Sequence, residues 1–348
     1  MSEEFKFSDV KPETILDWYL PENDPVSGRV VVGSNFVEIK ELIHFEVFVE
    51  KLYDEVEKRG DETDFNLKLD WVVDGVKKRI KYRAHKQESI DGKYVILRQM
   101  PVVLPELSDL GLPDAIKIIL EHENLKQGGL ILICGEPGNG KSTTTAAMIK
   151  RRLQKHGGFC LTLENPVEMP LQGRHGNGFC LQSPVDEGGF EKALSAAMRC
   201  YPTATSAMLY LGEIRSAETA AEALRIANNG HLVVTTLHSS GVITSIKRVL
   251  SLAKSNKMTE EEACSLMGSS LRLIIHQKLE YSAEKSEERK LKVSFIFSGS
   301  NTSSVANRVR NGGVDNLVTE VEQQNQLLKS SNTSQLNKLL EGWSKDIK

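Results

Sequence analysis

Residues 129–152 read GLILICGEPGNGKSTTTAAMIKRR, and this stretch decides the fold of the larger part of the chain. Its apolar run 130–134 predicts a buried β-strand, and the run from Lys141 onward predicts an α-helix. Between them, residues 135–142 follow the pattern G-x-x-x-x-G-K-[ST]. In that pattern the glycines let successive backbone N–H groups point at phosphates, and the helix N-terminus adds positive potential. The sequence therefore predicts a phosphate cradle.

The cradle supplies the expected nucleotide-binding residues. Lys141 is expected to bind the outer phosphates, and the Ser142 hydroxyl to coordinate Mg²⁺. The predicted nucleotide-binding residues are Gly135, Glu136, Pro137, Gly138, Asn139, Gly140, Lys141, Ser142 and Thr143. A cradle by itself is compatible with a kinase, a GTPase or an ATPase.

The patterns on either side of the cradle predict a two-domain α/β protein. Residues 35–59 have apolar side chains at steps of three and four, which predicts one or two helices, and residues 64–100 alternate with Asp-Gly turns, which predicts an antiparallel meander. Strand, loop and helix then alternate to about residue 250, as in a mostly parallel sheet covered on both faces. We therefore expect the following division: an α+β domain 1–100, a linker 101–107, an α/β domain 108–298 and a small helical segment 299–348.

Composition limits the classes of partner. The chain has 348 residues, with 44 basic and 47 acidic side chains, so no large basic excess indicates a nucleic-acid partner. Its five cysteines form no Cys-x-x-Cys pair, which fits a reducing cytosol and gives no zinc ribbon. The longest apolar runs are far shorter than the roughly 18–20 residues that span a bilayer. We expect no transmembrane segment.

Acidic and histidine residues follow three predicted strands after the cradle. Glu164 and Glu168 follow the strand FCLTL, Glu213 lies in GEIR after the strand AMLYL, and His231 and His238 flank the strand LVVTTL. Because ligands of parallel sheets bind at the carboxyl ends of the strands, the carboxylates are candidates for the site. The two histidines would lie roughly 23 Å apart on an extended strand, too far apart to bind one metal ion together.

The order of these motifs resembles the secretion ATPase superfamily that powers type II and type IV secretion and type IV pili, and within it the PilT-like and DotB-like motors. The resemblance runs from about residue 80 to about residue 310. It implies a PAS-like N-terminal domain, a RecA-like motor domain and assembly as a homohexameric ring. It also implies ATP and Mg²⁺ as ligands, and a cytoplasmic location at the inner membrane through a platform or secretion-channel protein.

The resemblance assigns roles to individual residues. Lys141 and Ser142 match the Walker A residues, Glu213 matches the Walker B glutamate, and Glu164 and Glu168 match the Asp box and would coordinate Mg²⁺ with Ser142. His231 and His238 match the His box, Arg83 and Arg98 resemble arginines that reach over the nucleotide, and Arg199 resembles an arginine upstream of Walker B. The implied catalytic residues are Glu213, Glu168, Glu164, Arg83, Arg98, His231, His238 and Arg199.

The sequence also departs from the family pattern. Asn165 replaces the usual Asp and removes one negative charge near the expected Mg²⁺, and Thr203 stands where the family tends to have Asp. Residues 305–310, VANRVR, resemble the motif of retraction motors only weakly. The first 60 residues match no part of the family pattern. Pilus extension, pilus retraction and type IV secretion therefore stay open.

We expect an ATPase whose hydrolysis moves the two domains of each subunit. The intact Glu213 favours this over a regulatory module that holds ATP and acts through protein contacts. A small-molecule kinase is a further alternative, although the sequence shows no acceptor-site motif. An ATPase assay with and without an acceptor distinguishes the three.

Overall fold

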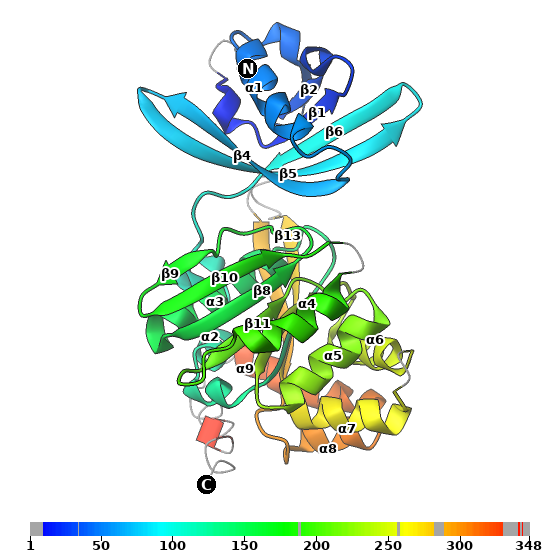
Figure 1. The fold of residues 1–348 in the computed structure, drawn as a ribbon. Helices are drawn as coiled ribbons and strands as arrows, with labels where there is room; N and C mark the ends of the chain where they lie inside the picture. Colours follow the sequence, from blue (N-terminus) through cyan, green and yellow to red (C-terminus); the bar gives the residue numbers. More distant parts are fainter. Residues whose placement is uncertain are drawn as a thin grey trace. The chain divides into compact units, whose positions relative to one another are not determined.

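The protein is described by a computed structural model that covers residues 10–33, 35–186, 189–255, 258–281, 289–329, 340–341 and 343. The chain divides into two compact units (Figure 1). One comprises the residues up to Val103 together with Pro166–Pro170, and the other comprises Leu104–Asn165 and Leu171–Lys348. The predicted α/β organisation in two parts is confirmed.

The first unit is an antiparallel sheet packed on one helix, α1 (Glu46–Glu57). The strand order is β3-β2-β1-β6-β5-β4. The strands are β1 (Asp17–Pro21), β2 (Arg29–Val32), β3 (Asn35–Glu38), β4 (Asp64–Val73), β5 (Val76–Ser89) and β6 (Gly92–Gln99). Trp18 is fully buried between sheet and helix, where its ring stacks on Phe48 and lies against Phe45. Three short 3-10 helices complete this unit within its described residues: Pro12–Thr14, Pro25–Ser27 and Ile39–Glu41.

The predicted meander is confirmed, whereas the predicted helix over 35–59 is too long. Strands β4, β5 and β6 pair in register, and the turn at Asp74-Gly75 has positive φ at both residues, as a tight hairpin requires. Residues 35–38, however, form β3 and pair with β2. Val37 is buried there while its neighbour Phe36 is 62% exposed, so these apolar residues do not share one helical face. Long-range strand pairing overrides the local spacing.

The second unit is built on an eight-stranded sheet of order β14-β13-β7-β12-β11-β8-β10-β9. All neighbouring pairs are parallel except β13 with β14 and β10 with β9. The strands are β7 (Gly129–Cys134), β8 (Gly158–Glu164), β9 (Gly173–His175), β10 (Gly178–Pro184), β11 (Ala207–Leu211), β12 (Leu232–Leu237), β13 (Leu271–Tyr281) and β14 (Arg289–Phe297). The carboxyl ends of β7, β12, β11 and β8 therefore lie side by side at one edge.

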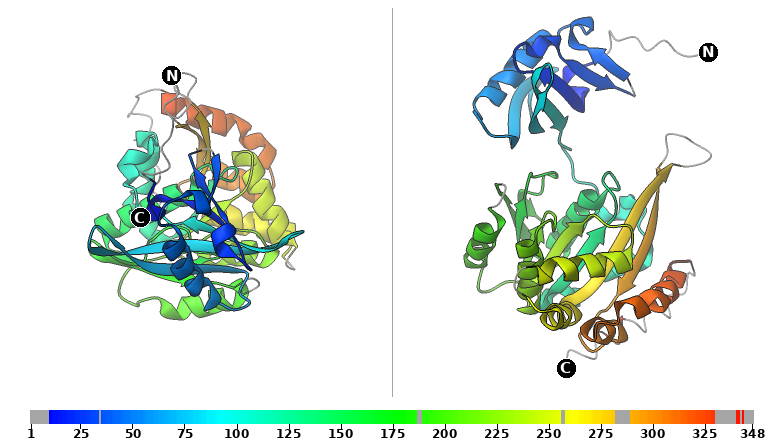
Figure 2. Two further views of the ribbon diagram at one scale, coloured as in Figure 1. Left: turned by 90° about the horizontal axis from the view of Figure 1, so that it is seen from above. Right: turned by 90° about the vertical axis from the view of Figure 1, so that its right-hand side faces the viewer.

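Helices cover both faces of this sheet (Figure 2). The helices are α2 (Asp114–Leu120), α3 (Lys141–His156), α4 (Phe190–Ala197), α5 (Ala217–Asn228), α6 (Val242–Lys254), α7 (Glu260–Ser270), α8 (Ser304–Arg310) and α9 (Val318–Lys329). Leu130, Leu132 and Cys134 of β7 join the core formed with α5, α6 and α7. Short 3-10 helices lie at Leu107–Leu110, Glu123–Gln127, Met198–Cys200 and Val314–Leu317. None of the helices in the described ranges has both the length and the apolar character to cross a bilayer.

The C-terminal segment predicted to be helical contains α8 and α9, and its end lies largely outside the described residues. Helix α9 packs beside β14 through amide side chains. Gln324 accepts from the Phe297 N–H at 2.6 Å and donates to the Phe297 carbonyl at 2.9 Å, while Asn325 accepts from the Phe295 N–H at 2.9 Å. The polar composition of 323–326 thus satisfies backbone groups of an outer strand.

Candidate functional site

The loop between β7 and α3 has the backbone geometry of a phosphate cradle. Gly138 and Gly140 have φ of 78° and 76°, a region that favours glycine. At Gly135 (φ 148°) a Cβ atom would lie 2.3 Å from the Gln277 carbonyl oxygen. Backbone and neighbouring strand therefore both require glycine at position 135. Glu136, Pro137 and Gly138 are exposed at the tip of the loop, and Lys141 begins α3.

Lys141 lies inside this loop and is 7% exposed. Its ammonium group donates to the carbonyls of Gly135 at 2.9 Å and Glu136 at 3.0 Å. It also lies 3.1 Å from Nδ1 of His238. Because an ammonium group has only donors, Nδ1 of His238 is the acceptor in this contact. The lysine head is thus held at the loop by two carbonyls and one imidazole.

His238 connects Lys141 to Glu213. Its Nε2 lies 3.1 Å from Oε1 of Glu213, and with Nδ1 accepting from Lys141 this Nε2 carries the proton. The second carboxylate oxygen, Oε2, accepts from Arg215 at 2.7 Å. The Glu213 side chain is 15% exposed, while that of Arg215 is 67% exposed. One imidazole therefore couples the cation of the cradle to the carboxylate at the end of β11.

The sheet topology explains why these residues meet. The cradle follows β7, His238 follows β12, and Glu213 follows β11, and these strands are neighbours in parallel register. Local contacts hold the edge together, because Thr236 donates to the Gly212 carbonyl at 2.6 Å and the Ile214 N–H donates to the Thr236 carbonyl at 3.0 Å. The arrangement combines phosphate-binding donors with a carboxylate that can orient water.

Glu164 lies at the same edge, at the end of β8. It is 2% exposed, accepts from Gln182 at 2.9 Å, and packs beside Gly212, where an added Cβ would lie 3.5 Å from its Cγ. Within the described ranges, no group of three or more His, Cys, Asp and Glu side chains is placed to hold a metal ion. Mg²⁺ usually takes only one or two carboxylates together with waters and phosphates, so a site with the Ser142 hydroxyl and the Glu164 carboxylate does not require such a group.

Gln277 is a residue of the site that the sequence patterns missed. It is 1% exposed, and its Nε2 donates to the Asn139 carbonyl at 2.5 Å. The next contact along β13 is similar, because the Leu279 N–H donates to Oδ1 of Asn139 at 3.0 Å. Strand β13 therefore holds the cradle in shape. No local signal marks Gln277, because its role depends on β13 pairing with β7, a strand far away in the sequence.

Two predicted site residues lie away from this edge. His231 precedes β12 and is thus at the amino end of the strand that His238 follows. Its ring lies against Tyr201, and burial lowers the pKa of His231. Arg199 is exposed in the 3-10 helix Met198–Cys200. The structure does not bring either residue to the cradle.

Three further predicted residues belong to the first unit. Arg83 and Arg98 are register partners on β5 and β6. Arg83 forms an ion pair with Glu168 at 3.1 Å, and Arg98 pairs with Asp17 at 2.6 Å, which raises the pKa of Arg98. The Arg83 and Glu168 side chains are 37% and 43% exposed, so their pair contributes little to stability.

Comparison with known proteins gives one family and several relatives. The family described as "Type II/IV secretion system protein" matches residues 40–345. The uncharacterized protein YggR of Escherichia coli K12 is 33% identical over 252 residues, which cover 71% of each chain. The type IV pilus retraction ATPase PilT of Pseudomonas aeruginosa is 32% identical over 63% of this chain, an alignment that spans only 58% of PilT.

A solved structure supports the same relationship. The crystal structure of the pilus retraction motor PilT with bound ADP superimposes with a TM-score of 0.69 at 26% identity, covering 89% of this chain and 86% of PilT. A coverage of 89% includes residues of both units, so the similarity extends beyond the sheet that carries the cradle.

Proposed function

The chain belongs to the type II/IV secretion system protein family, as the order of its motifs predicted, and we propose that it is an ATPase that powers a type IV pilus or a type IV secretion system. The observation that carries the proposal is the coupling of the cradle lysine to the Glu213 carboxylate through His238. A protein that only holds ATP has no need of a carboxylate joined to the phosphate-binding cation. The pilus ATPases among its relatives support the same class of reaction.

The site residues divide the chemistry of hydrolysis between them. Transfer of the γ-phosphoryl group to water needs an oriented water and neutralisation of charge on the phosphoryl oxygens. Lys141 and the N–H groups of the cradle neutralise the phosphates. Glu213 orients the water, and His238 fixes one carboxylate oxygen so that the other keeps a defined direction. Ser142 and Glu164 would hold Mg²⁺, which adds positive charge at the phosphates.

The remaining family features belong to the same proposal. The first unit is a PAS-like domain and the second a RecA-like motor, and six copies form a ring. Arg83 and Arg98 sense the γ-phosphate, Glu168 contributes to the Mg²⁺ shell, and hydrolysis changes the angle between the domains. The ring acts in the cytoplasm on an inner-membrane platform or secretion-channel protein. The resemblance of the motifs to those of secretion motors supports these assignments.

Steady-state release of phosphate from ATP tests the proposal. The protein should release phosphate with Mg²⁺ and without any acceptor. Lys141→Ala should lose ATP binding and turnover, because it removes the cation directed at the outer phosphates, while Lys155→Ala at the far end of the same helix serves as the control. Turnover near the wild-type rate in Lys141→Ala contradicts the assignment. Binding without hydrolysis indicates a regulatory module, and turnover only with an acceptor indicates a kinase.

A further inference from the structure

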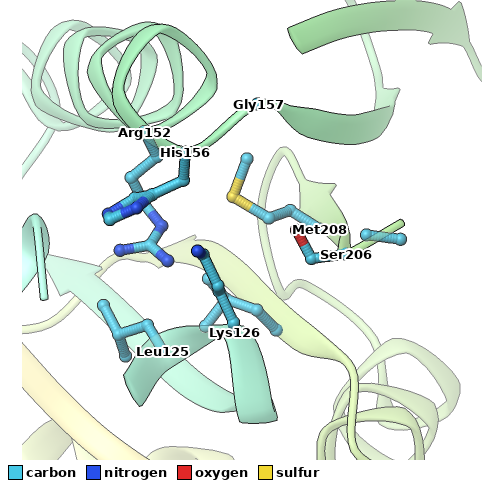
Figure 3. A pocket seen from close by; sticks show the side chains of 9 residues that line it. Leu125, Lys126, Arg152, His156, Gly157, Ser206 and Met208 are labelled. Carbon is cyan, nitrogen blue, oxygen red and sulfur yellow. The ribbon is translucent and has the colours of Figure 1, made fainter. Parts of the chain in front are cut away.

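A second group of cations lines a small hollow at the opposite edge of the large sheet (Figure 3). The hollow is partly open to solvent. Lys126, Arg152 and His156 line one side of it, and Ser206 and Met208 line another. These residues lie near the amino ends of β8 and β11 and at the last turns of α3, whose first residue is Lys141. At 1.5 Å per residue, this 16-residue helix separates the hollow from the cradle by roughly 22 Å.

Arg152 is the buried member of the group and is only 2% exposed. Its Nη1 donates to the carbonyls of Leu120 at 2.8 Å and His122 at 3.0 Å. Its Nε is buried and has no hydrogen-bond partner within the described part of the chain. A buried N–H of a charged group that lacks an acceptor is costly. Burial also lowers the pKa of Arg152 to about 10.

The positive charge around Arg152 is poorly compensated. No ion pair joins Lys126 or Arg152 to a carboxylate among the described residues, and Glu121, the acid that acts on Arg152, is itself paired with Arg151 and Lys155. Burial lowers the pKa of His156, and the charges of Arg152, Lys126 and Lys155 lower it further. The other titratable groups nearby are His122, whose pKa burial also lowers, and Glu123 beside it.

A purely structural role accounts for only part of this arrangement. Arg152 and His156 complement the C-terminal end of α3, and His156 Nε2 lies 2.8 Å from the Glu121 carbonyl oxygen. These contacts use Nη1 of Arg152 and one imidazole nitrogen. They leave the Arg152 Nε–H without an acceptor, and they leave the positive charges of Lys126 and Arg152 at one hollow, where both disfavour protonation of His156.

We propose that this hollow binds a tetrahedral oxyanion, a phosphate group that is either free or part of a monoester. The Arg152 Nε–H and the Lys126 ammonium group donate to its oxygens, as charge-assisted hydrogen bonds to phosphate do. The Ser206 hydroxyl is a further donor at the rim, and Met208 and Leu125 form an apolar wall. This site is separate from the nucleotide cradle and does not depend on the function proposed above.

Titration with sulfate, followed by NMR of the His156 imidazole, tests the site. Sulfate keeps its charge between pH 5 and 8, so any pH dependence of binding belongs to the protein. The His156 signals report the hollow even though sulfate also enters the cradle, because the two sites lie at opposite ends of α3. Sulfate should shift these signals and raise the pKa of His156, and it should bind more tightly as the pH falls from 7.5 to 5.5.

Two matched variants show whether sulfate binds to the residues of the hollow or is only attracted by the positive charge of this surface. Lys126→Gln should weaken sulfate binding about tenfold, because it removes a charged donor. Lys155→Gln removes the same charge from a residue that does not line the hollow, and it should change the affinity by less than about twofold. Equal losses in the two variants overturn the proposal. So do His156 signals that respond to sulfate no more than to chloride at equal ionic strength, which is the result for a hollow filled by water alone.

The source of the phosphate group follows from a second titration. Inorganic phosphate and glycerol phosphate are compared at one pH and ionic strength. Tighter binding of the ester indicates a ligand whose carbon skeleton contacts Met208 and Leu125, and tighter binding of inorganic phosphate indicates a free ion. Failure of both to move the His156 signals overturns the proposal.

Discussion

His238 contacts both the lysine of the cradle, Lys141, and the carboxylate of Glu213. With Nδ1 accepting from Lys141 and Nε2 donating to Glu213, its imidazole is fixed at both nitrogens. We expect phosphates in the cradle to compete with His238 for the Lys141 ammonium group. Occupation of the cradle should then alter the hydrogen bond between His238 and Glu213.

Replacing Glu213 by Gln should separate binding from chemistry. The variant keeps the cradle and the size of the side chain, so we expect ATP to bind with nearly unchanged affinity. Hydrolysis should fall by roughly 10²-fold, because the neutral amide no longer orients and activates the water. Nucleotide titration and phosphate release measure the two effects. Glu222→Gln, on α5, serves as the control.

An equal loss of binding and hydrolysis in Glu213→Gln would show that the carboxylate has a structural role. In that case its contacts with His238 and Arg215 hold the edge of the sheet together, and a different residue must orient the water.

Gln277→Leu should affect the cradle more than the fold. The change removes the hydrogen bond to the Asn139 carbonyl, and it also removes a buried amide oxygen that has no partner among the described residues. These two effects on stability oppose each other, so the melting temperature should change little. ADP affinity should fall about fivefold, since one hydrogen bond that shapes the loop is worth about 1 kcal/mol. Unchanged affinity would mean that the glycines alone shape the loop.

At the scale of elements, α9 completes the sheet at β14. The Gln324 side chain makes the same pair of bonds to Phe297 that a neighbouring strand would make. A helix thereby covers the backbone groups of an outer strand, which would otherwise pair with another chain or with water.

Gln324→Leu should therefore destabilise the second unit. It leaves the N–H and the carbonyl of Phe297 without partners at a site where Gln324 is 9% exposed, and each such group costs about 1–3 kcal/mol. Urea unfolding measures the loss. Gln326→Leu, an exposed position on the same helix, should change the midpoint little. Equal stability of the two variants would show that water replaces the amide without cost.

At the scale of the whole molecule, four half-buried histidines predict how the free energy of unfolding depends on pH. Burial is the main cause that lowers the pKa of His122, His156, His231 and His276 below 6.5. The folded state thus favours neutral imidazole, whose contribution to stability is complete above pH 6.5 and is lost as the pH falls through the folded-state values. The carboxylates with lowered pKa, such as Asp70 and Glu121, stay ionised in this range.

We therefore expect the free energy of unfolding to decrease from pH 7.5 to pH 5.5. Denaturant unfolding at several pH values measures the slope. His231→Gln should reduce that slope, because its side chain does not titrate, whereas a surface variant such as Gln326→Leu should leave it unchanged. A free energy of unfolding that rises toward pH 5.5 would contradict the lowered pKa of these histidines, because it requires that the folded state binds protons more strongly than the unfolded chain.

Local patterns in the sequence determined the position of several strands, of the glycine loop and of the helix that follows it. The strand, the loop and the helix of residues 129–152 lie where the pattern predicted them, because the positive φ of Gly138 and Gly140 and the start of α3 are marked by residues of the pattern itself. The meander of β4, β5 and β6 was predictable from its alternation and from the Asp74-Gly75 turn. The second predicted Asp-Gly turn is shifted by one residue, because Ser89 pairs with Gly92 and the turn residues are Ile90 and Asp91. The order of the motifs was also enough to identify the family.

Tertiary structure decided what depends on contacts between distant segments. Residues 35–38 follow a helical spacing but form β3, because pairing with β2 buries Val37 and leaves Phe36 outside. Gln277 reaches the cradle only because β13 pairs with β7, and His238 meets Lys141 and Glu213 only because β12 lies between β7 and β11. The period of a sequence fixes which face of an element is apolar, but the choice of neighbouring element depends on which surfaces can be buried together, and that is a property of the whole fold.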